Sequence, residues 1–289
     1  MLTREEFAFR LAQGPLLLDG ATGSNLQKAG MPRGCCTEEW ILANPEAIIA
    51  LQRSYAEAGS HIVYAPTFQA QPIALERVNL HRQTEAINAQ LVALSRAAAP
   101  GCLIAGDLTT LANFCDSWDE ESFDTLVENY RRQIHGLVDG GADLLIGETL
   151  LYPQEAEAIL VAAELESVPV SMFTFTMQSD ASLFSGRDAG PVLRSLEEAG
   201  ASAVGFNCVA ADMMTPYLVS KLRRSVKGPL ICKPNAGVPV INEGGIPVYS
   251  QTPEEFAAIA RQCRDNGASI FGGCCGTAPD FIRALRAVF

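Results

Sequence analysis

The segment Gly141-Ala142-Asp143-Leu144-Leu145 marks the point where a helical pattern ends and an apolar run begins. Glycine just past a helix adopts the left-handed conformation that other residues avoid, so a strand can begin at once. The same order of glycine, small residue, polar residue and apolar run recurs from Gly59, Gly200 and Gly267. These copies predict a repeating helix-to-strand unit along the chain.

Eight short apolar runs supply the predicted strands. Each run is continuous rather than alternating, as is typical of parallel strands that are covered on both faces. The runs comprise residues 16–19, 62–67, 103–108, 144–148, 170–175, 203–208, 230–233 and 270–274.

Helical patterns lie between these runs. Apolar residues from Phe123 to Val138 recur at helical spacing on one face. Thr252-Pro253-Glu254-Glu255 is a capping box with proline in the first turn, and Thr277-Ala278-Pro279-Asp280 predicts the start of the last helix in a similar way. Residues 1–14 predict a short amphipathic helix rather than a signal peptide, because charges stand where a signal peptide needs an apolar stretch.

Eight strands alternating with helices in a chain of 289 residues predict an α/β fold, a single (β/α)8 TIM barrel. A doubly wound open sheet is the alternative fold. No linker or composition shift divides the chain, so we expect residues 1–289 to form a single barrel domain. The longest connection, residues 20–44, follows the first strand, and we expect it to cover the active site.

The composition limits the classes of partner. The net charge of −12 argues against a nucleic-acid partner, because phosphate binding needs clustered Lys and Arg. No apolar run approaches the roughly 20 residues that span a bilayer, so we expect no membrane partner and a cytoplasmic protein. Nine cysteines in such a chain indicate buried residues, metal ligands or nucleophiles rather than disulfides.

Polar residues gather at the carboxyl ends of the predicted strands, where the active site of a TIM barrel lies. They are Asp19-Gly20, Pro66-Thr67-Phe68, Glu148-Thr149, Asn207-Cys208, Lys233-Pro234-Asn235 and Cys274-Cys275. The sequence therefore predicts an active site at this end of the barrel.

Three cysteines of this set, Cys208, Cys274 and Cys275, form a candidate metal site. Three thiolates leave the fourth tetrahedral position of zinc open to a substrate, as in catalytic sites. A thiol that enters this position loses its proton. Because neighbouring strand residues point to opposite faces, the two adjacent cysteines need a break in strand geometry, which the flanking glycines permit.

Other interpretations of the cysteines stay open at this point. Free cysteine is among the most buried residue types, so all three can be packing residues. Cys35-Cys36 is a second vicinal pair, which is most simply read as two loop thiols but can also compete as metal ligands or act as a redox pair. The remaining cysteines, Cys102, Cys115, Cys232 and Cys263, are predicted to be packing residues.

Four segments together resemble the homocysteine S-methyltransferase family. They are Asp19-Gly20-Ala21-Thr22-Gly23, Gly147-Glu148-Thr149, Gly205-Phe206-Asn207-Cys208 and Gly272-Gly273-Cys274-Cys275-Gly276-Thr277. The segments 17–21 and 233–237 are most similar to the homocysteine-binding module of cobalamin-dependent methionine synthase. The resemblance implies a zinc-dependent TIM barrel whose ligands match Cys208, Cys274 and Cys275.

The resemblance also implies a substrate and its site. Asp19 and Glu148 match carboxylates that hold the amino group of homocysteine, and Asn207, Gly20 and Thr67 belong to the expected substrate site. The implied reaction is methyl transfer to the thiolate of zinc-bound homocysteine, which gives methionine and places the protein in methionine biosynthesis. The implied donor is a methylcorrinoid on a separate protein or a methylsulfonium compound.

Two departures from the family pattern lie near the expected pocket. The chain reads Ala65-Pro66-Thr67 where members commonly carry Thr-Asn-Thr, and Gly23-Ser24 replaces a usual Gly-Thr. Two other functions remain as alternatives: an aldolase-type barrel with Lys233 as Schiff-base nucleophile, or a non-catalytic protein that binds zinc or thiols.

Overall fold

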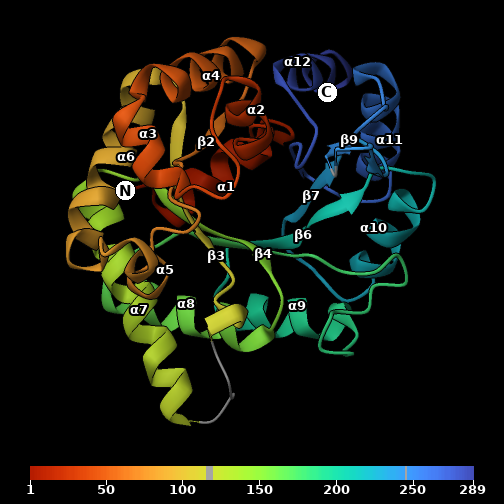
Figure 1. Cartoon of the computed structure of the whole chain (residues 1–289). Helices are drawn as coiled ribbons and strands as arrows, with labels where there is room; N and C mark the ends of the chain where they lie inside the picture. Colours follow the sequence, from red (N-terminus) through yellow and green to blue (C-terminus); the bar gives the residue numbers. More distant parts are fainter. Residues whose placement is uncertain (115–119, 245) are drawn as a thin grey trace.

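A computed structural model describes residues 1–114, 120–244 and 246–289, and it forms a barrel of eight parallel strands surrounded by helices (Figure 1). The strand order is β1-β10-β7-β6-β5-β4-β3-β2. The bounds are β1 Leu16–Leu17, β2 Ile62–Tyr64, β3 Leu103–Thr109, β4 Leu144–Leu150, β5 Ser171–Phe175, β6 Ala203–Ala210, β7 Leu230–Asn235 and β10 Ile270–Phe271. The predicted TIM barrel is confirmed, and the open sheet is excluded.

Hydrogen bonds between β1 and β2 join the two ends of this strand order. The backbone N–H of His61 donates to the carbonyl of Leu17 at 2.7 Å. The N–H of Leu17 donates in turn to Nδ1 of His61 at 3.0 Å. Near the carboxyl ends of the same strands, the N–H of Tyr64 donates to Oδ2 of Asp19 at 2.8 Å. A residue of the active-site end therefore contributes to barrel closure.

The helices lie outside the strands, with the shorter ones in the loops (Figure 1). Their bounds are α1 Arg4–Ala12, α2 Gly23–Lys28, α3 Thr37–Ala43, α4 Pro45–Ala58, α5 Pro72–Leu75, α6 Thr84–Ala98, α7 Glu120–Asp139, α8 Pro153–Leu165, α9 Ala189–Glu198, α10 Thr215–Arg223, α11 Pro253–Asp265 and α12 Pro279–Val288. Short 3-10 turns span Glu76–Val78, His81–Gln83 and Ala112–Phe114.

The two predicted helix starts differ in how their N-termini are capped. The Thr252 hydroxyl accepts the Glu255 N–H, and the capping box of α11 is confirmed. Helix α12 also begins at the predicted motif, with Pro279 in its first turn, but its N-cap is Ala278, which makes no side-chain cap bond. The Thr277 hydroxyl is engaged elsewhere: it donates to the carbonyl of Cys274 at 2.8 Å.

Side chains that alternate along the strands form two buried layers. One set, which includes Ile62, Ile146 and Ile231, fills the barrel interior together with Leu2 and Phe7 from the N-terminal segment. The other set packs between the strands and the outer helices. Side chains on a strand alternate with a period of two. Residues two positions after a member of the inner set therefore also point inward.

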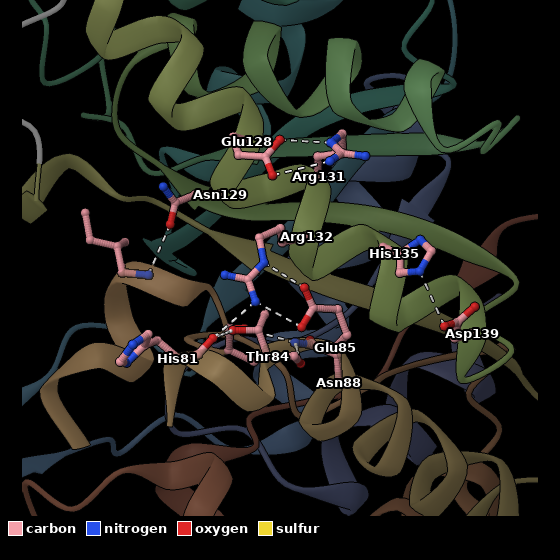
Figure 2. Close-up of polar contacts among 12 residues, drawn as sticks. His81, Thr84, Glu85, Asn88, Glu128, Asn129, Arg131, Arg132, His135 and Asp139 are labelled. Atoms are coloured by element: carbon pink, nitrogen blue, oxygen red, sulfur yellow. Dashed lines mark hydrogen bonds and ion pairs between the residues drawn. The ribbon is translucent and has the colours of Figure 1, made fainter. Parts of the chain in front are cut away.

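Helices α6 and α7 pack closely against each other on the outside of the barrel. Arg132 on α7 forms a bidentate pair with Glu85 on α6, with Nε–Oε1 and Nη2–Oε2 distances of 2.7 and 3.0 Å (Figure 2). A Cβ added at Gly136 would lie 2.5 Å from the backbone oxygen of Glu85. Glycine is therefore needed at this point of helix contact.

Several features differ from the predicted elements. Strand β10 ends at Phe271, so Cys274 and Cys275 lie in the loop after it. A two-stranded hairpin, β8 Val240–Ile241 and β9 Pro247–Val248, follows β7 and was not predicted. Among the described residues, no helix is long and apolar enough to cross a membrane. Cys115 lies outside the described residues.

Candidate active site

The carboxyl ends of the strands carry a layer of buried charges above the apolar interior. Asp107, Glu148 and Lys233 each follow by two residues an inner-face side chain of β3, β4 or β7. Their exposed fractions are 5%, 7% and 3%. Three charged groups this deeply buried need partners, because an isolated buried charge is strongly unfavourable.

Lys233 is the central cation of this layer. Its Nζ lies 2.7 Å from Oε1 of Glu148 and 4.8 Å from the ring centroid of Tyr64. Although burial lowers the pKa of Lys233, the charges of Glu148, Cys274 and Asp19 outweigh it and raise this pKa well above its ordinary value. Lys233 is therefore an ammonium, and a Schiff-base nucleophile needs a neutral amine.

Two carboxylates remain only partly satisfied. One oxygen of Asp19 accepts the Tyr64 N–H, but its Oδ1 and the Oδ1 of Asp107 are buried without a hydrogen-bond partner among the described residues. Burial raises the pKa of Asp19 to about 7, against the attraction of Lys233. Burial, followed by repulsion from Glu148, raises the pKa of Asp107 well above its usual range. The layer is therefore short of positive charge.

The sulfur atoms of Cys208, Cys274 and Cys275 lie within 4.8 Å of one another, as the sequence predicted. This is the one cluster of potential metal ligands among the residues that the structure describes. Cys208 lies where the register between β6 and β7 shifts, and its φ is +59°. A φ in this region is uncommon for a residue with a side chain and accompanies local bending.

The loop after β10 is fixed to its neighbours by backbone hydrogen bonds. The N–H of Gly273 donates to the carbonyl of Asp19 at 3.0 Å, and that of Cys274 to the carbonyl of Pro234 at 2.7 Å. Hydrogen bonds of this loop with β1 and β7 thus replace a regular strand ladder. This is the break in strand geometry that two adjacent ligands require.

Asn207 connects the cysteine cluster to β4. Its Oδ1 accepts the N–H of Thr149 at 3.0 Å, and its Nδ2 donates to Oγ1 of Thr149 at 2.6 Å. The same Nδ2 lies 3.7 Å from Sγ of Cys274. Thr149 occupies a register shift in β4 and has a φ of +58°, like Cys208 in β6. A fully buried amide therefore links two irregular strand ends.

Thr277 joins the cysteine loop to the first strand. Its hydroxyl accepts the N–H of Ala21 at 3.1 Å while it donates to Cys274. A Cβ added at Gly20 would lie 2.6 Å from the hydroxyl oxygen of Tyr55 and 2.9 Å from that of Thr277. Glycine at position 20 thus permits the close approach of these two loops.

The three thiols share protons unequally. Hydrogen bonds from Cys208 and then Cys274 lower the pKa of Cys275 to about 3. The complementary bonds to Cys274 and Cys275 raise the pKa of Cys208. Of the three thiols, Cys275 is therefore the one that loses its proton most readily, and the thiolate is the form of cysteine that binds metals.

These groups line a cavity of about 290 Å³. The lining residues that matter most here are Asp19, Gly20, Glu38, Tyr64, Asp107, Glu148, Lys233, Cys208, Cys274 and Cys275. Residues 20–24, 37 and 38 of the first long connection also line it, so this connection covers the site as predicted. Thr67 and Asn207 are fully buried and do not line the cavity.

Sequence reasoning missed two carboxylates of this cavity, Asp107 and Glu38. Asp107 interrupts an apolar run, and period-two counting from Ala105 would have placed it on the inner face. Glu38 is 2% exposed, and its Oε1 accepts the N–H of Gln69 at 2.8 Å. No strand pattern precedes Glu38, so the sequence carries no comparable signal for it.

The other described cysteines lie apart from the metal cluster. Cys102, Cys232 and Cys263 are buried, which agrees with packing roles. Cys35 is exposed, and the sulfur of Cys36 lies 3.5 Å from Oε2 of Glu38.

Comparison with known proteins gives concordant matches along the chain. The family model described as homocysteine S-methyltransferase matches residues 16–289. The methionine synthases of Mycobacterium leprae and Mycobacterium tuberculosis are each 26% identical to the chain over 96% of its length. The chain spans about a quarter of the length of these relatives, 24% and 25% respectively.

A solved structure matches over both whole chains. The metallated form of the homocysteine methyltransferase MmuM from Escherichia coli has a TM-score of 0.81 and 26% identity, and the match covers 97% of this chain and 98% of that chain. Its oxidized form has a TM-score of 0.80. With the barrel, the cysteine cluster and a family match over almost the entire sequence, this chain belongs to the homocysteine S-methyltransferase family.

Proposed function

We propose that this chain transfers a methyl group to the sulfur of homocysteine, giving methionine, and that zinc is held by Cys208, Cys274 and Cys275. The observation that carries this proposal is the convergence of three sulfurs within 4.8 Å of one another in the wall of a cavity. Thiolates around a tetrahedral zinc ion lie about 3.8 Å apart. The donor set and its spacing therefore fit zinc.

The role of zinc follows from this donor set. Three protein thiolates leave one coordination position for a substrate. When bound, zinc supplies the Lewis acidity that keeps a substrate thiol deprotonated at neutral pH. The metallated form of MmuM, which matches this chain over 97% of its length, supports a metal in this family.

The charge layer provides a site for the ammonium group of homocysteine. The cavity lining contains Lys233 as its cation against four carboxylates, Asp19, Glu38, Asp107 and Glu148. Glu148 is already paired with Lys233, while Asp19 and Asp107 each retain an unpartnered oxygen. We propose that Asp19 and Asp107 accept hydrogen bonds from the ammonium group of homocysteine. Glu148 contributes to the charge balance of the site by pairing with Lys233.

The two fully buried residues outside the lining have supporting roles in this proposal. Thr67 donates to the backbone carbonyl of Asp107 at 2.8 Å and so supports the strand that carries this carboxylate. Asn207 holds Thr149 and contacts Cys274. We further propose that residues 1–289 act as one homocysteine-binding barrel domain.

In the proposed reaction the substrate sulfur forms a bond to the methyl carbon. The bond between this carbon and the donor breaks, and its electron pair leaves with the donor. The donor is a methylcorrinoid carried by another protein or a methylsulfonium compound. Neither requires a general base from the chain, because the substrate sulfur is already deprotonated.

An assay of the purified chain with homocysteine and each donor tests this function. Methionine formation is measured with methylcobalamin, S-methylmethionine and betaine, and bound zinc is measured on the same samples. We expect about one zinc per chain and methionine from at least one donor. Cys274→Ala should lose both, whereas Cys35→Ala, a substitution of an exposed cysteine outside the cluster, should keep both. Full zinc retention and activity in Cys274→Ala would overturn the proposal.

A further inference from the structure

The ammonium group of Lys233 has more hydrogen-bond donors than the chain uses. An ammonium group carries three N–H donors and no acceptor. Among the described residues, its one hydrogen bond goes to Oε1 of Glu148, at 2.7 Å. The Tyr64 ring, whose centroid lies 4.8 Å from Nζ, adds a cation–π contact. At least one N–H is therefore left for an acceptor that the chain does not supply.

The side chain of Lys233 is built into the wall of the cavity rather than lying on the surface. It is 3% exposed and lines the cavity together with the cysteine cluster. A Cβ added at Gly272 would lie 3.3 Å from Cγ of Lys233 and 2.9 Å from the carbonyl oxygen of Asp19. The absence of a side chain at position 272 thus leaves room for the lysine stem beside Asp19.

Lys233 also lies next to the proposed metal ligands along the chain. The residue that follows it, Pro234, accepts the N–H of Cys274 at 2.7 Å. An amino acid whose sulfur is bound at the cysteines therefore meets both Asp19 and Lys233 in the same cavity of about 290 Å³.

The charges of the cavity favour Lys233 as the place for the carboxylate of such an amino acid. Lys233 is the only Lys, Arg or His among the described residues of the lining, which also contains four carboxylates. A substrate carboxylate would be repelled beside these four groups. The buried hydroxyls of Ser24 and Tyr64 have no partner among the described residues, but neutral donors form weaker hydrogen bonds than an ammonium group does.

We propose that Lys233 is a specificity-determining residue that binds the carboxylate of the substrate amino acid while it stays paired with Glu148. This inference rests on the proposed function, because it takes homocysteine as the substrate. Asp19 and Asp107 then hold the ammonium group of homocysteine. Lys233 distinguishes an amino acid from an amine or a simple thiol that has no carboxylate.

Two ligands isolate the contribution of the carboxylate. Methionine has both charged groups, whereas 3-(methylthio)propylamine has the same chain and ammonium group without the carboxylate. Calorimetric titration of the full chain at a fixed pH gives the Kd of each ligand. We expect the wild-type chain to bind methionine at least about tenfold more tightly than the amine.

Two variants that differ only at residue 233 assign this preference. Glu148→Gln keeps the lysine and should keep the preference. The double variant Lys233→Met with Glu148→Gln leaves no buried charge unpaired and preserves the net charge of the cavity. In this variant we expect the two ligands to bind about equally, because the carboxylate has lost its partner. Lys227→Met, at an exposed lysine outside the cavity lining, is the matched control.

A measurement on the unmodified protein complements the variants. In a chain with isotope-labelled lysine, the Nζ resonance of Lys233 should shift on addition of methionine and stay in place on addition of the amine. A resonance that methionine leaves unmoved would overturn the inference even if the double variant did not fold.

The affinities separate this inference from the proposed function. Equal binding of both ligands by a wild-type chain that forms methionine from homocysteine would overturn the inference alone. A double variant that keeps the preference would also overturn it and would assign the carboxylate to neutral donors such as Ser24 or Tyr64. A wild-type chain that binds neither ligand would overturn the homocysteine site and this inference together.

Discussion

The carboxyl oxygens of Asp19 link the substrate site to barrel closure at the scale of single residues. One oxygen accepts the Tyr64 N–H across the β1–β2 contact, and the other faces the site without a partner among the described residues. A buried acceptor without a partner is unfavourable, and in the proposed function the ammonium group of homocysteine would relieve this cost. Under this proposal, ligand binding depends on the protonation state of Asp19.

Asp19→Asn should change the pH dependence of amino-acid binding. The pKa of Asp19 is raised to about 7, so its charge is present above pH 7 and is lost below it. Methionine is the ligand of choice for this test, because it has no thiol proton whose titration would add to the pH dependence. We expect the Kd of methionine for the wild-type chain to rise as pH falls from 8 to 6. The limiting slope is about tenfold per pH unit. In Asp19→Asn the Kd at pH 8 should be at least about tenfold weaker, with a flatter dependence.

Calorimetric titration with methionine at several pH values measures this effect. Asp265→Asn serves as control, because this carboxylate is exposed on α11 and lies outside the cavity lining. Parallel pH curves for wild type and Asp19→Asn would contradict the role of Asp19.

Asn207→Ala should weaken zinc binding without removing a ligand. The variant loses the paired bonds to Thr149 and the contact with the Cys274 sulfur. Groups that orient metal ligands typically contribute about 10–100-fold to affinity. Competition with a chromophoric chelator gives the zinc Kd, and Asn266→Ala, a substitution at the end of α11 outside the cluster, is the control. Equal affinities for the two variants would argue against the orienting role.

At the scale of secondary-structure elements, strand ends rather than strand centres carry the function. The apolar runs identified all eight barrel strands, because buried parallel strands need continuous apolar sequence. Their ends were less predictable. Hydrogen bonds of the loop at Gly273 and Cys274 end β10 early, and the register shifts at Thr149 and Cys208 depend on neighbouring strands. Such tertiary contacts leave no local pattern.

The contact between α6 and α7 depends on the absence of a side chain at Gly136. Gly136→Ala should lower the free energy of unfolding by about 1–2 kcal/mol, because the new Cβ would meet the Glu85 backbone at 2.5 Å. Backbone cannot move aside as a flexible side chain can. Intrinsic helix propensity alone favours alanine by about 1 kcal/mol, so the two effects have opposite signs.

Urea unfolding of both proteins measures this difference in the free energy of unfolding. The ion pair between Arg132 and Glu85 lies at the same interface (Figure 2). Gly101→Ala is the control, since a Cβ at Gly101 meets no atom within 4 Å. A Gly136→Ala protein that is more stable than wild type would contradict the close packing of these helices.

At the scale of the whole molecule, the sequence predicted the barrel from patterns along the chain, and it predicted the cysteine cluster from the strand ends together with the family resemblance. The cavity could be predicted only in part. Asp19, Gly20 and Glu148 line it, and Asp107 follows from strand periodicity. Glu38 reaches the site from α3, through a loop path that a single sequence does not define.

His61 connects barrel closure to pH. Its Nδ1 accepts the Leu17 N–H, and burial followed by the charges of Arg10 and Arg286 lowers its pKa. A lowered histidine pKa means that the unfolded chain binds the proton more readily. The contribution of His61 to stability is therefore lost as pH falls below about 6.5, the ordinary value for histidine.

His61→Asn keeps an acceptor for the Leu17 N–H but does not titrate. Between pH 7.5 and 5.5, we expect the Tm of the wild-type chain to fall by roughly 1–2 °C more than that of His61→Asn, a small effect because the imidazole is partly exposed. Scanning calorimetry at both pH values decides this. Identical pH trends would show that protonation of His61 does not affect barrel closure.

The anchoring of the loop that carries Cys274 and Cys275 has a consequence for the zinc binding that we propose. Backbone bonds to Asp19 and Pro234, and the Thr277 hydroxyl, hold this loop by means that need no metal. In small zinc modules, by contrast, the metal drives folding itself. Here the backbone of the loop is already in place without an ion, so zinc bound as proposed could be taken up or lost while the barrel stays folded.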